Sequence, residues 1–249
     1  MTKVAKKENA VSTIAIPDDY DVGISREDVK MPAILLWQKM SEMVEFEDAS
    51  VKAGQFVCPV SGDVLGTSFE GAVIKSFATA KMLGEPDDSG RRTVERFSSD
   101  CISWNDGARI MPNEFAWQGG EPPKALKSFH YLVIAKELFE KGFELPAIVT
   151  FKGTSAKHAK TLNANLLYAK PAWRSWTKFF SAVEEKNGNR YHIMQSKNQP
   201  KRLVSDDVAQ MCFDTYVSLK NQTLTSSEME ATPVDKEKDF DGAKVDFAG

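Results

Sequence analysis

Short runs of β-forming residues, bounded by Gly, Pro, Asn, Asp or Ser, recur along most of the chain, the pattern of strands separated by turns. They predict strands at residues 55–60, 64–66, 71–77, 128–134 and 145–151. The turn-forming sequence Ser61-Gly62-Asp63 separates the first two. A shorter apolar run at 31–40 is either a first strand or a buried turn of helix. The pattern predicts a mainly β (α+β) protein.

Two segments change to a helical period. From 155 to 168, apolar residues recur on one face, and Ser155 is placed to cap the amino end. The segment 205–220 repeats this arrangement, with Ser205 as its predicted cap. This second helix either covers the sheet or pairs two copies of the chain as a homodimer.

The segment 173–183 fits both a strand and one face of a helix. The downstream sequence Asn187-Gly188 favours a strand, because it supplies the positive φ angles of a tight hairpin turn. We therefore predict a β-hairpin with strands at 173–184 and 190–196. One face of its first strand then carries alternating basic and aromatic side chains: Arg174, Trp176, Lys178 and Phe180. A helix would remove this shared face.

Three segments lack a packing pattern. Residues 1–30 are polar and aperiodic, which predicts a flexible N-terminal arm, and residues 222–249 are acidic with few core-forming residues, which predicts a disordered tail. Between 84 and 124, Gly, Pro, Asp, Asn and Ser dominate and predict a long loop. Its aromatic residues either anchor the loop or contact a ligand. The folded domain is predicted at 31–221.

Composition narrows the class of protein. The chain has 249 residues, of which 42% are hydrophobic and 27% charged, as in soluble globular proteins. The N-terminus lacks the apolar core of a secretory signal, and no apolar run approaches the roughly 20 residues of a membrane span. The three cysteines lie far apart, which argues against a disulfide framework and a zinc ribbon. We expect a cytoplasmic protein without membrane contact, metal or other cofactor.

Charge is arranged in blocks along the chain. Residues 151–202 contain eleven Lys or Arg and two acids, a net charge of +9 in a chain of net charge −3. Cations for phosphates and flat rings for bases are what a binder of single-stranded DNA needs. We predict phosphate contacts at Lys152, Lys157, Lys160, Arg174, Lys178, Arg190, Lys201 and Arg202, and base stacking on Trp173 or Trp176, Phe180 and Tyr191. The simpler alternative is an exposed basic face over an ordinary core.

Two other classes of function stay open. Glu184-Glu185-Lys186 matches the loose E-x-K spacing of some nucleases, so a metal-dependent nuclease is one alternative. The other is a virion or regulatory protein whose basic face binds an acidic protein. No nucleophile–base pair, phosphate-binding loop or dinucleotide fingerprint occurs in the sequence. We therefore favour binding over catalysis and predict no catalytic residues.

A longer run of sequence supports this choice. The segment 145–162, LPAIVTFKGTSAKHAKTL, follows the turn at Ser61-Gly62, the long Gly/Pro loop and the strand at 128–134. In this order the chain resembles phage-encoded single-stranded DNA-binding proteins of the OB-fold type. The resemblance implies an OB-fold-like β-barrel with flanking helices, and sequence-tolerant binding of single strands during bacteriophage DNA replication and recombination in the host cytoplasm.

One residue departs from that family. Some similar phage proteins carry a cysteine cluster in the long loop, whereas this chain has only Cys101 there. A zinc site in the loop is therefore not expected.

The C-terminal tail extends the resemblance. Members of this family end in an acidic segment with an aromatic residue near the terminus, as Phe240 and Phe247 stand here. The resemblance implies contacts with replication or recombination proteins through Asp239, Phe240, Asp241, Asp246 and Phe247. Because residues 223–249 carry a net charge of −4, we also expect the tail to compete with DNA for the basic stretch.

Overall fold

The computed structural model of the protein describes residues 31–38, 51–86, 92–119, 123–186 and 188–220. The chain divides into two compact units, residues 1–30 and 31–249, and every described residue belongs to the second. The predictions made for the N-terminal arm and for the tail at 222–249 therefore lie outside the described residues.

The described chain is mainly β, as predicted. Its strands are β1 (Ala33–Leu36), β2 (Phe56–Cys58), β3 (Asp63–Gly66), β4 (Ser68–Pro86), β5 (Arg92–Ser98), β6 (Ala125–Ala135), β7 (Ala147–Phe151), β8 (Ser175–Lys186) and β9 (Asn189–Leu203). Its helices are α1 (Lys136–Phe139), α2 (Ala156–Tyr168) and α3 (Asp206–Leu219), with 3₁₀ turns η2 (Pro112–Phe115), η3 (Gly153–Ser155) and η4 (Ala172–Arg174). The strand at 31–40, the hairpin and the two longer helices are confirmed.

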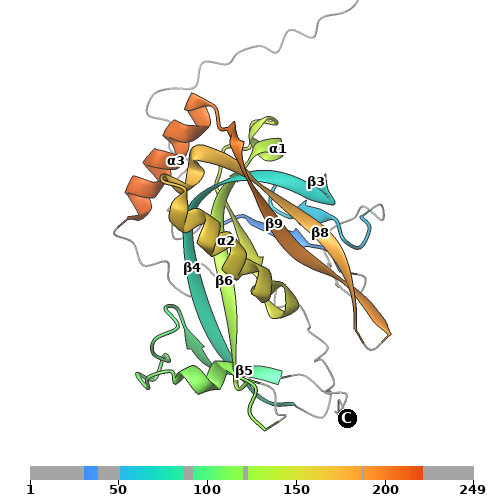
Figure 1. The fold of residues 1–249 in the computed structure, drawn as a ribbon, viewed down its shortest axis with the longest axis vertical. Helices are drawn as coiled ribbons and strands as arrows, with labels where there is room; N and C mark the ends of the chain where they lie inside the picture. The colour runs from blue at the N-terminus through green and yellow to red at the C-terminus, as the bar shows by residue number, and fades with distance from the viewer. Residues whose placement is uncertain (1–30, 39–50, 87–91, 120–122, 187, 221–249) are drawn as a thin grey trace, which may run out of the picture. The chain divides into compact units, whose positions relative to one another are not determined.

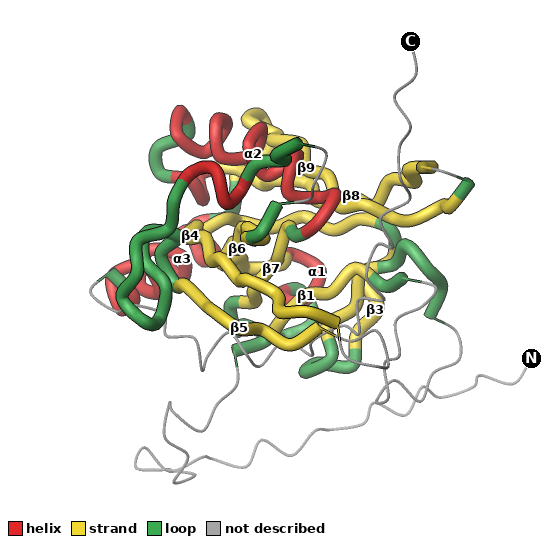
Figure 2. Tube along the Cα trace, turned by 90° about the horizontal axis from the view of Figure 1, so that it is seen from below, coloured by secondary structure: helices red, strands yellow, loops and turns green. Residues whose placement is uncertain are grey.

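All of these strands belong to one sheet that curls into a half-barrel (Figure 1). The strand order is β3-β2-β1-β7-β6-β4-β8-β9, and β5 pairs with the far end of β4. Figure 2 shows β4, β6, β7 and β1 following one another across the sheet. The β1–β7 pair is parallel, whereas the other pairs are antiparallel. The closed barrel of an OB-fold remains a prediction.

The concave face of the sheet holds the larger core. Phe56 of β2 meets Phe69 of β4 across the curl, with ring centroids 5.1 Å apart, although three strands separate β2 from β4 in the sheet. Phe69 in turn stacks on Phe179 of β8 at 5.0 Å. Helix α2 contributes Ala159 and Leu162 to this core, so the predicted apolar stripe of the helix is confirmed.

The convex face is covered by α3. Its buried residues Val208, Cys212 and Leu219 pack against the sheet, where Leu132 and Trp176 belong to the same cluster. The sheet is thus covered on both faces near its middle, because each of the two helices presents one apolar stripe. Of the two roles predicted for this helix, the structure shows the covering one.

The Gln38 side chain joins the end of β1 to the edge strand β9 across the curl. The Gln38 amide, just after β1, donates to the carbonyl of His192 on β9 at 2.7 Å and accepts the His192 N–H at 3.2 Å. Gly54 lies against the same histidine with φ +87°, and a Cβ there would lie 2.4 Å from the ring nitrogen Nδ1. A single glutamine therefore supplies the pair of hydrogen bonds that a neighbouring strand would otherwise supply.

The predicted loop at 84–124 is wrong in its first part. β4 continues to Pro86, and β5 returns beside it. Gly84 belongs inside the strand because β5 packs over it, and a Cβ there would lie 2.7 Å from Oε1 of Glu95. Within the segment, the described residues 99–119 pack onto β4 and β6 through the buried Trp104 and Ile110, so Trp104 serves as an anchor.

Smaller corrections concern the ends of elements. The Ser155 hydroxyl does not cap α2 but accepts a hydrogen bond from the Met194 N–H at 2.9 Å, and Ser205 makes no side-chain cap.

β8 begins at Ser175, because 172–174 form η4, so Trp173 and Arg174 lie before the hairpin. β9 runs beyond the predicted end at 196, through Pro200 to Leu203. Proline is tolerated there since β9 lies at the edge of the sheet.

Candidate nucleic-acid interface

The β8–β9 hairpin brings two lysines face to face. Its register runs from Lys186 opposite Asn189 to Lys178 opposite Lys197. Both Lys178 and Lys197 are exposed. Directly opposed like charges destabilise a strand pair, so this pair of ammonium groups costs free energy in the absence of an anion. Local stability alone does not explain it.

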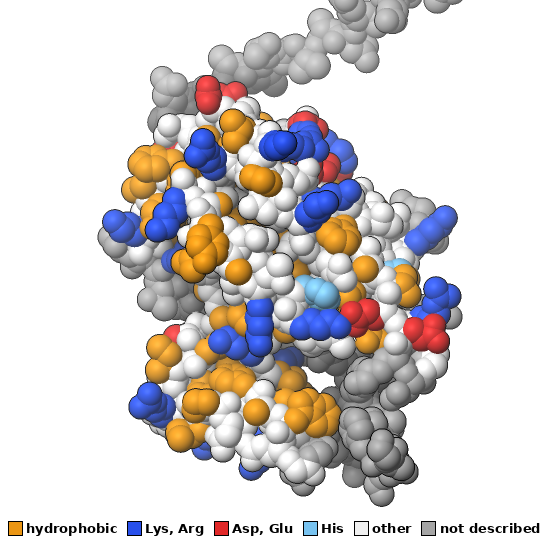
Figure 3. All heavy atoms as spheres, in the orientation of Figure 1, with side chains coloured by type: hydrophobic (Ala, Val, Ile, Leu, Met, Phe, Trp, Pro, Cys, Tyr) orange, Lys and Arg blue, Asp and Glu red, His pale blue; other side chains and the backbone are white. Residues whose placement is uncertain are grey.

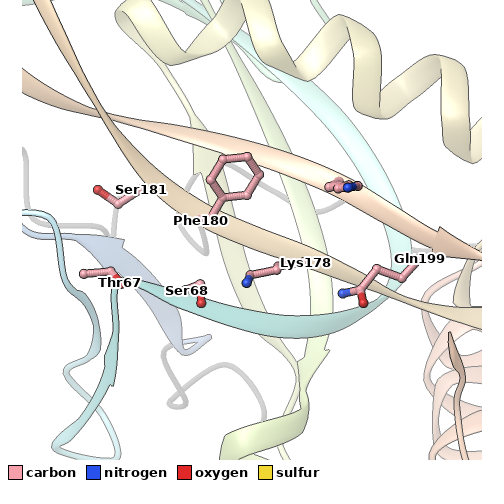
Figure 4. A pocket seen from close by; sticks show the side chains of 7 residues that line it. Thr67, Ser68, Lys178, Phe180, Ser181 and Gln199 are labelled. Atoms are coloured by element: carbon pink, nitrogen blue, oxygen red, sulfur yellow. The ribbon is translucent and has the colours of Figure 1, made fainter.

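These lysines border a groove of about 430 Å³ between the hairpin and the start of β4, which we call the hairpin groove. It is lined by Thr67, Ser68, Lys178, Phe180, Ser181, Lys197 and Gln199. In Figure 4 the Lys178 ammonium lies between Ser68 and the Gln199 amide, and the Phe180 ring stands beside them. The groove thus combines two cations, three hydroxyls, one amide and one half-exposed aromatic ring.

Within the described residues, neither Lys178 nor Lys197 has an ion-pair partner. Glu70 of β4 lies opposite Lys178 in the register, yet its carboxylate is occupied elsewhere. It pairs with the Arg202 guanidinium, accepts a hydrogen bond from Gln199 at 2.9 Å and lies 3.6 Å from Lys136 Nζ. The positive potential of the groove is therefore left uncompensated.

We call the group around Glu70, together with Arg202, Lys136 and Gln199, the Glu70 cluster. Glu70 is 9% exposed. Glu137 lies next to it and accepts the Glu70 backbone N–H through both carboxylate oxygens, at 3.1 and 3.2 Å. Burial raises the pKa of Glu137. In this cluster the predicted phosphate ligand Arg202 is engaged by a carboxylate of its own chain.

The tip of the hairpin shows similar compensation. Lys157 of α2 donates to Glu184 at 2.6 Å, and the Tyr191 hydroxyl donates to the same carboxylate at 3.3 Å. His158 Nε2 lies 3.8 Å away. The hydrogen bond from Lys157 keeps the pKa of Glu184 below its usual value. Lys157 and Tyr191 are thus tied to a carboxylate.

The other predicted cations are open to solvent. Lys160 on α2, Arg174 on η4, and Arg190 and Lys201 on β9 are exposed, whereas Lys152 before η3 is half-buried. Figure 3 shows Lys and Arg side chains spread over the face that carries α2 and the hairpin, with few acidic side chains among them. Lys160, Arg174, Arg190 and Lys201 are therefore accessible to an anionic ligand.

The predicted stacking residues divide into two groups. Phe180 lines the hairpin groove and is half-exposed. Trp176 is only 6% exposed and packs under α3, so its ring has no face for a base, and we withdraw it from the set. Trp173 packs on Tyr216 of α3, with ring centroids 5.4 Å apart, and holds the start of the hairpin against the helix.

The structure adds residues that the sequence prediction omitted. Lys197, Gln199 and the hydroxyls of Thr67 and Ser68 line the groove beside the predicted Lys178 and Phe180. Tyr168, at the end of α2, is 85% exposed. The helical period places it on the same stripe as Lys157 and Lys160, a signal that was present in the sequence.

For the nuclease alternative, the described residues show no group of metal ligands around Glu184 and Glu185. Glu184 is held by Lys157 and Tyr191, and Glu185 lies opposite Arg190 in the hairpin register. Across the described ranges, no three His, Cys, Asp or Glu side chains come together in a group that could hold a metal ion. The hypothesis therefore still rests on the E-x-K spacing alone.

Comparison of the chain with protein-family models, with curated proteins and with solved structures found no match. In the part of the chain that the structure describes, no helix has the length and apolar character needed to cross a membrane.

Proposed function

We propose that this protein binds single-stranded DNA without strong sequence preference, and that the hairpin groove is the centre of its binding surface. The observation that carries the proposal is the opposed pair Lys178 and Lys197, uncompensated within the described residues and placed beside Phe180. An anionic ligand removes the repulsion between the two ammonium groups. A phosphodiester of the DNA backbone is such an anion, and the base attached to it has a flat face for the phenyl ring.

The groove favours a single strand over a duplex. A base can stack on Phe180 only when it has left its own base stack, which a single strand permits at little cost. The hydroxyls of Thr67 and Ser68 and the Gln199 amide offer hydrogen bonds to phosphate or sugar oxygens without selecting one base. Lys160, Arg174, Arg190 and Lys201 extend the basic surface for neighbouring phosphates.

The resemblance stated for the sequence adds three parts to this proposal. The half-barrel serves as an OB-fold-like platform, the protein acts in phage DNA replication or recombination, and the acidic tail contacts partner proteins of those processes. Binding, rather than catalysis, is the proposed activity. The tail residues Phe240 and Phe247 lie outside the described residues, so this last part rests on the sequence alone.

Fluorescence anisotropy with a labelled oligo-dT, its matching duplex and an RNA strand tests the proposal. We expect the DNA strand to bind more tightly than the duplex, with an affinity that falls steeply as salt rises, because each neutralised phosphate releases counterions. Equal affinity for strand and duplex, or no binding at low salt, would overturn the proposal. Incubation of the same strand with Mg²⁺ or Mn²⁺ should leave it intact, and cleavage would favour the nuclease alternative.

A further inference from the structure

The long strand β4 has a gap along one edge. β6 pairs with one side of it, from Gly71 to Met82. On the other side β8 pairs with Ser68–Gly71 and β5 with Ala80–Pro86. Between them, no strand of the described part pairs with 72–79, and η4, which leads into β8, lies against β4 next to Gly71. The unpaired stretch is about 26 Å of strand edge, at roughly 3.3 Å per residue, and an unpaired edge offers N–H and C=O groups to an added strand.

A pocket of about 480 Å³ opens at this gap. Its floor is six consecutive residues of β4, from Val73 to Ala78. Since successive side chains of a strand point to opposite faces, a pocket that touches all six opens onto the edge of the strand. The pocket is therefore a slot beside β4, and an extended segment is the shape of ligand that fits it.

The walls of the slot come from both layers that cover the sheet. Leu166 and Leu167 of α2 form one side, Tyr216 of α3 forms the other, and Phe129 of β6 and Ala172 of η4 complete it. α2 and α3 both lie beside β4 in Figure 1. Leu167 is 68% exposed although it lines this apolar slot. An apolar side chain entering the slot would cover it.

The chain itself passes this slot. The Lys75 ammonium of β4 donates to the carbonyl of Leu219, the last residue of α3, at 3.1 Å. The chain therefore leaves α3 within reach of the Lys75 side chain, which also lines the slot. The three residues that follow Leu219 can span up to about 10 Å, which brings Thr223 within reach of the gap. From there the sequence reads Thr223-Leu224-Thr225-Ser226-Ser227.

We propose that residues 223–227 add to β4 as a further strand, with Leu224 seated in the slot. Thr223 and Thr225 are β-branched residues, which favour strands, and Leu224 between them is the one large apolar residue of this short segment. Attachment to α3 gives the segment a high effective concentration at the edge. Pairing of residues 223–227, which come shortly after α3 in the sequence, does not depend on DNA binding.

Residue-resolved hydrogen exchange on the full-length protein tests this pairing. Alternate amides between Lys75 and Thr79 point away from β6, and an added strand protects them. Leu224→Pro removes the amide N–H and fixes φ, so it should release the strand without changing charge. We expect these outward amides to exchange at least about tenfold faster in this variant than in the unaltered protein. Ala231→Pro, farther along the same tail, is the matched control and should change nothing.

Three results would overturn the proposal. Outward amides that exchange as fast as an open chain in the unaltered protein would mean that the slot is empty. Protection that survives Leu224→Pro but is lost in Ile14→Pro would assign the slot to the N-terminal segment. Protection that rises with protein concentration would assign it to a second copy of the chain.

Discussion

The Glu70 cluster and the hairpin groove share strands β4 and β9, and both contain cations. The cluster adds Lys136 of α1, whereas the groove adds Lys178 and Phe180 of β8. In the cluster, the Arg202 guanidinium and the Lys136 ammonium meet a carboxylate that is almost buried. In the groove, Lys178 lies opposite Lys197 in the strand register, and neither has an ion-pair partner within the described residues. The two regions look alike in the sequence, where each contributes to a single basic stretch. In space one is compensated and the other is not.

The difference shows how to separate structural cations from ligand-binding ones. A cation that is already paired with a carboxylate loses that ion pair when it binds a phosphate. The net free energy of DNA binding from such a cation is therefore small. An uncompensated pair gains the whole interaction. We therefore expect the groove to carry most of the affinity for DNA, and the cluster to carry stability.

The largest expected effect is on DNA affinity when the groove loses its charge. Lys178→Gln with Lys197→Gln should weaken binding of oligo-dT about 100-fold, if each ammonium contributes about 1.4 kcal/mol. The slope of log affinity against log salt should fall by about 1.4, since two phosphate contacts are lost. Anisotropy titrations at several salt concentrations measure both quantities.

The matched control removes the same charge from compensated positions. Lys157→Gln with Arg202→Gln should weaken binding by less than about fivefold, because both cations are already paired with carboxylates. An equal loss of affinity in the two double variants would mean that compensation does not matter and that net charge alone drives binding.

Acid should act on the fold that both regions share. The His130 ring of β6 lies between the hydroxyls of Thr79 and Thr150, each 2.9 Å away, and burial lowers its pKa to about 4. An unfolded histidine titrates near 6.5, so the unfolded chain takes up the proton first as the pH falls. This contribution to stability is complete above about pH 6.5 and is lost progressively towards pH 4. We expect about 2.5 kcal/mol less stability at pH 4.5 than at pH 7, as measured by urea unfolding.

Replacement of that histidine isolates its effect. His130→Asn does not titrate, so the stability of this variant should change less between pH 7 and pH 4.5 than that of the unaltered protein. The same loss in both proteins would assign the acid sensitivity to other groups.

The aromatic part of the groove should matter somewhat less than its charge. Phe180→Ala should weaken binding of oligo-dT about 30-fold, since one stacked base contributes roughly 2 kcal/mol. The salt dependence should stay unchanged, because no cation is removed. Trp176→Phe is the control: it should lower stability and leave affinity as it is, since Trp176 is buried under α3. A large loss of affinity in the tryptophan variant would contradict this division.

The smallest expected effect comes from turning the cluster into a second uncompensated site. Glu70→Gln should lower the free energy of unfolding by about 1–2 kcal/mol, because Arg202 and Lys136 lose their carboxylate. It should also raise affinity for oligo-dT about threefold, because Arg202 becomes available to a phosphate. Lower affinity in this variant would show that Glu70 supports the groove instead of competing with it.

Much of the fold could be predicted because the period of side chains is a local property. The run of β-forming residues at 128–134 and the apolar stripe at 155–168 predicted the right elements, and both elements are present in the structure. β5 and the end of β4 were missed because Gly84 and Pro86 usually mark turns. Their place in the sheet follows from the pairing of β4 with β5, in which Glu95 lies over Gly84.

The residues of the candidate site could likewise be predicted only in part. Lys197 could have been found, because a two-residue Asn-Gly turn pairs Lys186 with Asn189, and counting outward pairs Lys178 with Lys197. The pairing of Glu70 with Arg202 could not, since 132 residues separate the two. The burial of Trp176 likewise depends on where α3 docks. Sequence can thus name the cations of a surface, whereas compensation is decided by contacts between distant strands.

The Gln38 contact has a consequence for synthesis of the chain. Gln38 and His192 are 154 residues apart, so at about 5–20 residues per second the partner of Gln38 leaves the ribosome roughly 8–30 s later. β1 also waits for β7, its parallel neighbour. β1 is the first strand of the sheet to be synthesised, yet its contacts with β7 and β9 form late. A nascent chain stalled before β7 has β2 available to one edge of β1 but leaves the other edge open to any chaperone or neighbouring chain.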